Sequence, residues 1–198
     1  MTGFTSIGVV LAAGKGTRMK SDKPKVLHEI AGLPMLGHVL TALRAAQTSG
    51  AVVVVSPDGE QVRAFAERFE PRAEVAVQEQ ALGTGDAVRA GLPHIGSTDA
   101  VIVVFGDTPL IRAETISKMA GEIEAGRDIV VLGFQSADPT GYGRLILGPD
   151  GALERIVEEK DATAVERAVT LCNGGGIAVR SAHLPTLLGE IDTNNAKG

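Results

Sequence analysis

Several residue types that mark familiar protein classes are scarce in this chain of 198 residues. The single cysteine, Cys172, excludes a disulfide framework and fits a reducing compartment, and we expect it to be a small buried hydrophobe. The four histidines are scattered and show no zinc-binding spacing with the cysteine. With no tryptophan, one tyrosine and five phenylalanines, the core must be built from Val, Ile, Leu and Ala, which suits a parallel sheet covered by helices.

Charge and hydropathy argue against two kinds of partner. The net charge is −5, and no basic excess of the kind that nucleic-acid surfaces need is apparent. No apolar run approaches the roughly 18 residues of a membrane span, and the N-terminus lacks the charged-then-apolar order of a signal peptide. The sequence therefore predicts a cytoplasmic protein that binds neither nucleic acid nor membrane.

Apolar runs alternate with helical patterns along the first two thirds of the chain. This alternation favours right-handed crossovers and an α/β fold with a doubly wound, mostly parallel sheet. The last third of the chain has a different pattern. There the turn signal Gly148-Pro149-Asp150-Gly151 separates two short strand patterns and predicts an antiparallel hairpin. The buried strands expected before it cover residues 7–11, 51–55, 74–78, 100–105 and 129–134.

The most informative segment is a glycine-rich, basic loop after the first strand, Leu11-Ala12-Ala13-Gly14-Lys15-Gly16-Thr17-Arg18-Met19, followed by Lys23-Pro24-Lys25. Small residues let backbone amides approach a ligand, and the cations suit a triphosphate. The loop is not a P-loop, because no Gly-Lys-Ser/Thr follows. It is not a dinucleotide fingerprint either, because Met19 takes the place of the third glycine. A flexible basic turn is the alternative.

Two further motifs follow other predicted strands. Asp107 closes the strongest strand, and ligands bind where parallel strands end, so this carboxylate would face a polyphosphate through Mg²⁺. Alternatively, Asp107 caps the helix expected after Pro109. Gln78 precedes a glycine-containing turn and offers a base edge both a donor and an acceptor. The alternative for that segment is a tight turn that starts a helix.

Three motifs in the last third carry the amide, glycine-backbone and carboxylate groups that suit the hydroxyls and acetamido group of a sugar. Taken singly, each is better explained as a turn, a solvated charge run or a glycine bulge. The motifs are Gly141-Tyr142-Gly143-Arg144, Glu158-Glu159-Lys160-Asp161 and Asn173-Gly174-Gly175-Gly176.

In this order, the motifs resemble the N-terminal uridylyltransferase domain of the bacterial bifunctional N-acetylglucosamine-1-phosphate uridyltransferase / glucosamine-1-phosphate acetyltransferase family. The resemblance runs from about Gly8 to the last residue, and its more particular members include Lys23-Pro24-Lys25-Val26-Leu27, Leu82-Gly83-Thr84-Gly85 and Asn194-Asn195-Ala196-Lys197-Gly198. It implies a Rossmann-like nucleotidyltransferase fold with a nucleotide-binding part at about 1–135 and a sugar-binding part at about 136–198.

The resemblance also implies an activity and the residues that perform it. UTP and N-acetylglucosamine 1-phosphate would give UDP-N-acetylglucosamine, a precursor of peptidoglycan and lipopolysaccharide, and pyrophosphate. Arg18, Lys25 and Asp107 would be catalytic, with Asp107 as the Mg²⁺ ligand. The nucleotide would be held by Leu11, Ala12, Ala13, Gly14, Gly16, Gln78, Gly83 and Thr84, and the sugar by Thr84, Phe105, Gly143, Glu158 and Asn173.

The chain departs from the family in several places. Phe105 stands where the family often has tyrosine, Ala81 where glutamine is common, and glycines follow Asn173 in place of the usual pattern. The family continues into residues that supply a second metal ligand, an asparagine, and into a left-handed β-helix that carries the acetyltransferase and forms the trimer. We therefore expect this chain to be a fragment that is monomeric and weakly active or inactive.

The sequence leaves three alternatives to this function. A related transferase would use another sugar phosphate or base, such as glucose 1-phosphate or a molybdopterin-type partner. A nucleotide-sugar binder would bind without turnover. An oxidoreductase would need the dinucleotide fingerprint that Met19 interrupts.

Overall fold

The structure is a computed structural model that describes residues 3–14, 16, 19 and 21–191. The chain forms two compact units: unit 1 is Met1–Val130 with Ile177–Gly198, and unit 2 is Val131–Gly176. The predicted division at about residue 135 differs from these units at the C-terminal end, because the segment from Ile177 onward belongs with the first unit.

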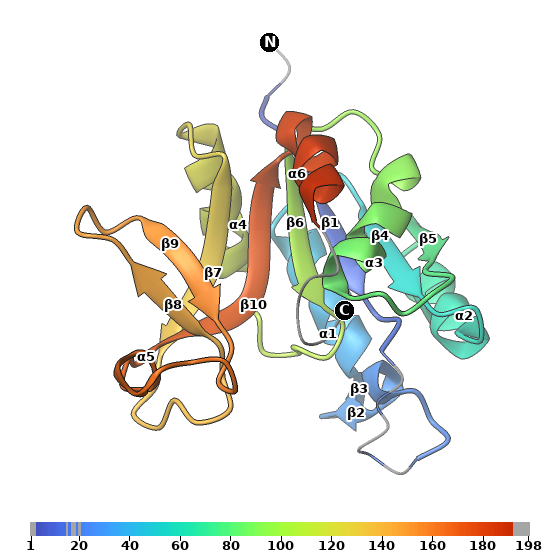
Figure 1. Cartoon of the computed structure of the whole chain (residues 1–198). Helices are drawn as coiled ribbons and strands as arrows, with labels where there is room; N and C mark the ends of the chain where they lie inside the picture. The colour runs from blue at the N-terminus through green and yellow to red at the C-terminus, as the bar shows by residue number, and fades with distance from the viewer. Residues whose placement is uncertain (1–2, 15, 17–18, 20, 192–198) are drawn as a thin grey trace. The chain divides into compact units, whose positions relative to one another are not determined.

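Unit 1 is built on a mostly parallel sheet (Figure 1). Its strand order is β5-β4-β1-β6-β10, so successive crossovers run outward in opposite directions from β1, as in a doubly wound sheet. Only β10 is antiparallel, and its residues 177–180 pair with β6. The strands are β1 (Ser6–Leu11), β4 (Ala51–Val55), β5 (Ala73–Val77), β6 (Ala100–Phe105) and β10 (Leu171–Arg180).

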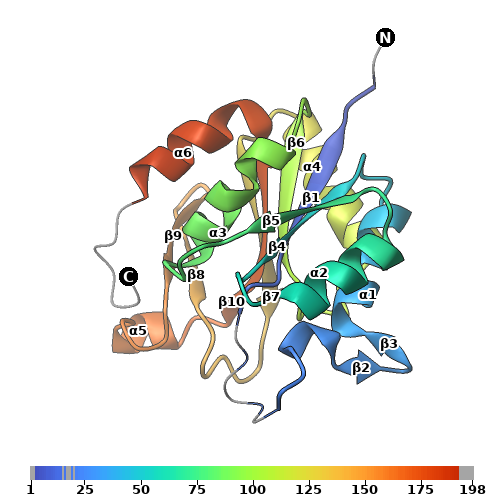
Figure 2. The ribbon, with the colours of Figure 1, turned by 90° about the vertical axis from the view of Figure 1, so that its right-hand side faces the viewer.

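Helices cover both faces of this sheet, with α3 beside α6 on one of them (Figure 2). None of the described helices is long and apolar enough to cross a membrane. A short hairpin of β2 and β3, which the sequence pattern did not indicate, precedes α1. The remaining elements of unit 1 are η2 (Lys25–Leu27), β2 (Glu29–Ile30), β3 (Leu33–Pro34), α1 (Met35–Ala45), α2 (Glu60–Phe69), α3 (Thr84–Gly91), η3 (Leu92–His94), α4 (Ala113–Glu124), η4 (Ser181–His183) and α6 (Leu184–Glu190).

The core of unit 1 follows from the two-residue period of its strands. Ile7, Val9 and Leu11 of β1 join the buried cluster that includes residues of α3 and α6. Gly8, on the opposite face, lies against α1 so closely that an added Cβ would be 2.6 Å from Cδ1 of Leu43. Strands buried on both faces explain the continuous valine-rich runs in the sequence.

Unit 2 contains the predicted antiparallel hairpin. Strands β8 (Arg144–Leu147) and β9 (Leu153–Val157) pair antiparallel, and β7 (Ile129–Gln135) pairs with β10. The short helix α5 (Ala164–Arg167) follows β9. Cys172 lies opposite Arg144 in the β10–β8 pairing and is fully buried, which confirms its predicted role as a small core residue.

Candidate active site

A pocket of about 600 Å³ lies at the carboxyl edge of the sheet in unit 1. It brings together the predicted catalytic residues Lys25 and Asp107, Phe105 and every residue predicted to hold the nucleotide. Arg18, the other predicted catalytic residue, lies outside the described residues. The nucleotide-binding candidates that line the pocket are Leu11, Ala12, Ala13, Gly14, Gly16, Gln78, Gly83 and Thr84.

Strand register explains why these distant segments meet. β1 and β6 are parallel neighbours with Leu11 opposite Phe105, so the loops after both strands start at the same level of the sheet. The Gly106 amide donates to the Leu11 carbonyl at 2.9 Å, and the Ala12 amide donates to the Val54 carbonyl at 2.8 Å. The start of the glycine-rich loop is therefore fixed by main-chain hydrogen bonds to both neighbouring strands.

Lys25 and Asp107 form an ion pair at the pocket, with 2.5 Å between Nζ and Oδ2. Their side chains are 41% and 29% exposed, so both remain accessible to a ligand. Gly16 passes directly over the lysine: its φ is +56°, and an added Cβ would lie 2.7 Å from Cβ of Lys25. Helix α4 is preceded by Arg112 as N-cap, so Asp107 does not cap it and the alternative role for this carboxylate is not observed.

Gln78 is buried at the pocket and held by both its backbone and its side chain. Its amide donates to the Val55 carbonyl at 2.8 Å, and its Nε2 donates to the Gly83 carbonyl at 3.1 Å and to Oδ2 of Asp86 at 2.9 Å. Gly83 precedes α3 with a φ of 113°, a conformation that favours glycine. The motif had indicated Gln78 and Gly83, whereas Asp86 resembled an ordinary acidic residue in a first helical turn.

In unit 2, Gly143, Glu158 and Asn173 are neighbours. The Asn173 amide donates to the Gly143 carbonyl at 2.8 Å, and a Cβ on Gly143 would lie 3.3 Å from Oε1 of Glu158. The Asn173 side chain accepts a hydrogen bond at 2.9 Å from the amide of Gly175, whose φ is +81°. The remaining predicted sugar-binding residues, Thr84 and Phe105, line the pocket of unit 1.

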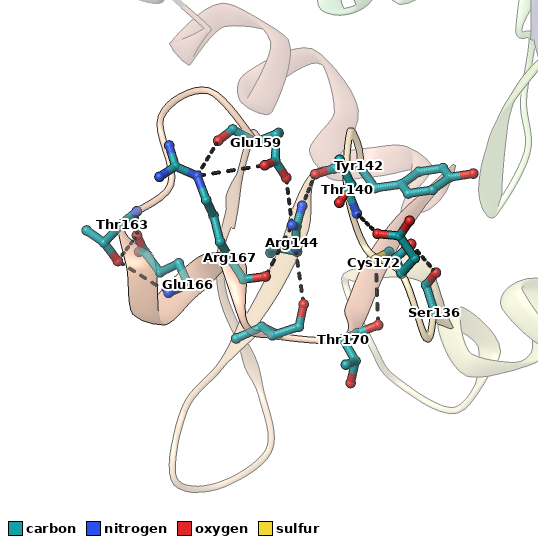
Figure 3. Close-up of polar contacts among 12 residues, drawn as sticks. Ser136, Thr140, Tyr142, Arg144, Glu159, Thr163, Glu166, Arg167, Thr170 and Cys172 are labelled. Atoms are coloured by element: carbon teal, nitrogen blue, oxygen red, sulfur yellow. Dashed lines mark hydrogen bonds and ion pairs between the residues drawn. The ribbon is translucent and has the colours of Figure 1, made fainter.

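The sequence pattern missed the centre of unit 2, which is Arg144 (Figure 3). Its side chain is 1% exposed and donates to Oε2 of Glu159 at 2.6 Å. It also donates to the carbonyls of Tyr142, Val169 and Arg167. Arg144 therefore ties together the residue before Gly143 and the residue after Glu158. Its hydrogen bond is the main cause that lowers the pKa of Glu159.

A second polar group stabilises the start of α5 (Figure 3). Thr163 and Glu166 form a capping box, in which each side chain bonds the other residue's backbone amide. Arg155 donates to Oε1 of Glu166 at 2.6 Å. The hydrogen bond from Arg155, followed by those from Thr163, lowers the pKa of Glu166 to about 2.

Comparison with known proteins defines the class of this chain. It belongs to the family of MobA-like NTP transferase domains, whose model matches residues 8–171. Bifunctional protein GlmU of Parvibaculum lavamentivorans is 58% identical over 96% of this chain and 42% of that protein. Bifunctional protein GlmU of Xanthobacter autotrophicus is 48% identical over the same shares, 96% and 42%. The chain thus spans about 42% of the length of these curated relatives.

A solved structure confirms the fold class. The crystal structure of a UDP-glucose pyrophosphorylase complexed with UDP-glucose matches with a TM-score of 0.80 and 16% sequence identity, over 98% of this chain and 83% of that chain. The doubly wound nucleotidyltransferase fold and the family resemblance found in the motifs are both confirmed.

Proposed function

We propose that this chain is the nucleotidyl-transferring domain of an enzyme that condenses UTP with N-acetylglucosamine 1-phosphate. The observation that carries the proposal is the convergence of glycine-rich backbone, Lys25, Asp107 and Gln78 on one pocket at the carboxyl edge of the sheet. Family membership supports nucleotidyl transfer in general. The motifs of both units and the GlmU name of the curated relatives favour this substrate pair.

In the proposed reaction, an oxygen of the sugar phosphate attacks the α-phosphorus of UTP in line. A new P–O bond forms, the bond to the β-phosphate breaks, and pyrophosphate leaves with the electron pair. A phosphate monoester is already anionic near neutral pH, so no protein base is needed. In agreement, none of the described residues that line the pocket is a histidine. Lys25, together with Arg18, would position and neutralise the phosphates.

The donor set at the pocket fits Mg²⁺ bound together with substrate. No group of three or more His, Cys, Asp or Glu side chains that could hold a metal is found within the described residues. Mg²⁺, however, is usually held by one or two carboxylates plus substrate phosphates and water. Asp107 would supply that carboxylate, and the bound ion would polarise phosphate oxygens as a Lewis acid.

The neighbouring groups in unit 2 suit recognition of the sugar. Gly143 leaves room beside the Glu158 carboxylate, and Asn173 adds a side-chain amide. A carboxylate accepts hydrogen bonds from hydroxyls, and an amide can pair with an acetamido group. We therefore assign N-acetylglucosamine recognition to these residues.

Calorimetric titration with UDP-N-acetylglucosamine, UDP-glucose, a CDP-sugar and GDP-mannose, each with Mg²⁺, tests the proposal. Binding comes before turnover in this test because the chain spans about 42% of its relatives' length. Tightest binding of UDP-N-acetylglucosamine is expected, and Lys25→Ala should weaken it. Lys118→Ala, which removes an exposed lysine of α4, is the matched control.

Each other outcome contradicts a stated part of the proposal. Equal binding of both UDP-sugars would keep the uridine site and overturn the sugar assignment. Preference for the CDP-sugar or GDP-mannose would overturn UTP as the substrate. A binding protein would be favoured if UDP-N-acetylglucosamine bound tightly while UTP and N-acetylglucosamine 1-phosphate released no pyrophosphate, both in this chain and in a relative of full length.

A further inference from the structure

The orientation of the Gln78 side-chain amide is set by two hydrogen-bond acceptors that face its nitrogen. Nε2 faces the Gly83 carbonyl at 3.1 Å and Oδ2 of Asp86 at 2.9 Å. A carbonyl and a carboxylate can only accept hydrogen bonds, so both require the NH₂ end of the amide. Rotating the amide by half a turn would place three acceptors together. The nitrogen is therefore fixed toward α3.

The other end of the same amide is consequently an acceptor available at the pocket. The hydrogen bonds of this side chain to described residues are both made by Nε2, and no buried side-chain nitrogen or oxygen among those residues lacks a partner, so Oε1 is open to the pocket. Gln78 lines the pocket together with Gly83 and Thr84. Because the side chain is buried and its backbone is tied to Val55, the acceptor is held in place before a ligand arrives.

Asp86 is connected through Arg89 to α6, the last helix of unit 1. Its Oδ1 lies 3.9 Å from Nη1 of Arg89, and Nη2 of Arg89 donates to the Leu188 carbonyl in α6 at 2.5 Å. Figure 2 shows α6 beside α3. The Asp86 side chain is 23% exposed, so this contact is shielded from much of the solvent. The carboxylate that orients Gln78 is thus part of a connected set of contacts.

We propose that Asp86 is a positioning residue that sets base selectivity, a proposal that rests on the proposed nucleotidyl-transfer function. By holding Nε2 of Gln78, Asp86 leaves Oε1 to meet the base. An acceptor at that position pairs with the ring N3–H of uracil. It repels the N3 lone pair of cytosine, which places an acceptor at the corresponding atom. Discrimination by an unmatched buried polar group is much stronger than discrimination by shape alone.

Asp86→Asn tests the proposal, because asparagine keeps the shape and can donate to Gln78. Only the Gly83 carbonyl then still requires the NH₂ end of Gln78, so the turned amide, which offers NH₂ to the base, becomes easier to reach. We expect the ratio of the CTP and UTP dissociation constants, measured by calorimetry with Mg²⁺, to fall roughly tenfold. Asp86→Ala, which removes the acceptor without adding a donor, should give a smaller fall. The ratio cancels any general effect of the lost charge, since both ligands carry the same triphosphate.

Glu79→Gln is the matched control, since it removes an exposed carboxylate next to Gln78 and should leave the ratio unchanged. An unchanged ratio in folded Asp86→Asn and Asp86→Ala, judged by their melting curves, would overturn the role of Asp86 while UTP binding upholds the proposed function. Preference of the unsubstituted chain for CTP would overturn the orientation argument itself. Binding of neither nucleotide would overturn the proposed function, and this inference with it.

Discussion

The two units fix their candidate ligand-binding residues by different physical means. In unit 1 the pocket is formed where parallel strands end, and main-chain hydrogen bonds place the loops. The charged side chains there, Lys25 and Asp107, are partly exposed and pair only with one another in the described contacts. In unit 2 the loops around Gly143 and Glu158 are tied by one buried side chain, that of Arg144.

This difference predicts that the charged side chains of the unit 1 pocket can be replaced with little loss of stability, whereas the buried Arg144 of unit 2 cannot. A partly exposed ion pair contributes little to stability, because water and salt screen it. A buried arginine with four hydrogen bonds contributes through every partner that would lose its hydrogen bond. Substitutions can therefore test the comparison directly.

Arg144→Met should have the largest effect on stability. It removes the donor that Arg144 supplies to Oε2 of Glu159 and to the carbonyls of Tyr142, Arg167 and Val169. Breaking a buried, hydrogen-bonded arginine contact in this way costs about 3 kcal/mol or more. Chemical denaturation should show that loss. Amide hydrogen exchange should accelerate at residues 139–143 and 158–169.

Arg155→Met is the matched control within unit 2, because the Arg155 side chain is 56% exposed. Its effect should be much smaller than that of Arg144→Met. Equal losses for the two variants would contradict the role assigned to the buried arginine.

Lys25→Ala and Asp107→Asn should leave stability almost unchanged and strongly reduce the rate of the reaction. Their ion pair is worth about 1 kcal/mol of stability or less, so melting curves should barely move. In this chain extended to the full length of its relatives, the rate of pyrophosphate release should fall roughly hundredfold or more, because each variant removes a charge aimed at the reacting phosphates. For Asp107→Asn, uridine binding should fall far less than the rate. Equal losses of rate and uridine binding would count against a metal-binding role, and Glu114→Gln, on the exposed surface of α4, serves as the control.

The same contrast explains what the sequence could predict. Valine-rich runs indicate the strands of unit 1, and the rule that ligands bind where parallel strands end predicts that Asp107 lies near the basic loop. Arg144 could not be placed, because an arginine in a glycine-rich turn is normally exposed. Its burial depends on acceptors 2, 15, 23 and 25 residues away.

The contact of Asp86 with Gln78 and the β2–β3 hairpin could not be predicted from the sequence, for related reasons. An acidic residue in a first helical turn has a local explanation in the helix dipole, which hides its contact with Gln78. The hairpin strands are two residues each, too short for a period to show. Their turn places Ala31 at a φ of 51° and Gly32 at 81°, and alanine gives no signal for that conformation.

Gly83→Ala, in unit 1, should reduce both stability and UTP affinity, with a stability loss between those of the preceding variants. With a φ of 113° and a ψ of −178°, Gly83 occupies a region that other residues rarely adopt. The strain should cost about 1–3 kcal/mol. The shifted carbonyl would also release Nε2 of Gln78, so UTP affinity should fall.

Gly121→Ala is the control: Gly121 lies in α4 with no atom within 4 Å of an added Cβ, and alanine there should be neutral or stabilising. A Gly83→Ala variant as stable as Gly121→Ala would contradict the strain argument.

The smallest expected effects concern stability at acid pH. The two units can be compared there with one carboxylate variant in each unit. The pKa of Glu166 in unit 2 lies at about 2 against an ordinary 4.5, and backbone and side-chain hydrogen bonds from Thr5 lower the pKa of Asp99 in unit 1 below 3.8. A carboxyl whose pKa is depressed by folding binds protons more readily in the unfolded state. Its contribution is therefore present above the ordinary pKa and lost as pH falls through the folded one.

Local hydrogen exchange, followed from about pH 5 to about pH 2, reads each unit separately. Protection of α5 should fall as the pH is lowered from 4.5 toward 2, and Glu166→Gln should flatten that dependence. Asp99→Asn should flatten the dependence of the amides around Thr5 at pH values below 3.8 and leave α5 unchanged. Each variant is the control for the other. If either one altered the acid dependence of both units equally, the two units would unfold as a single cooperative body, and the separation of their stabilising contacts would fail.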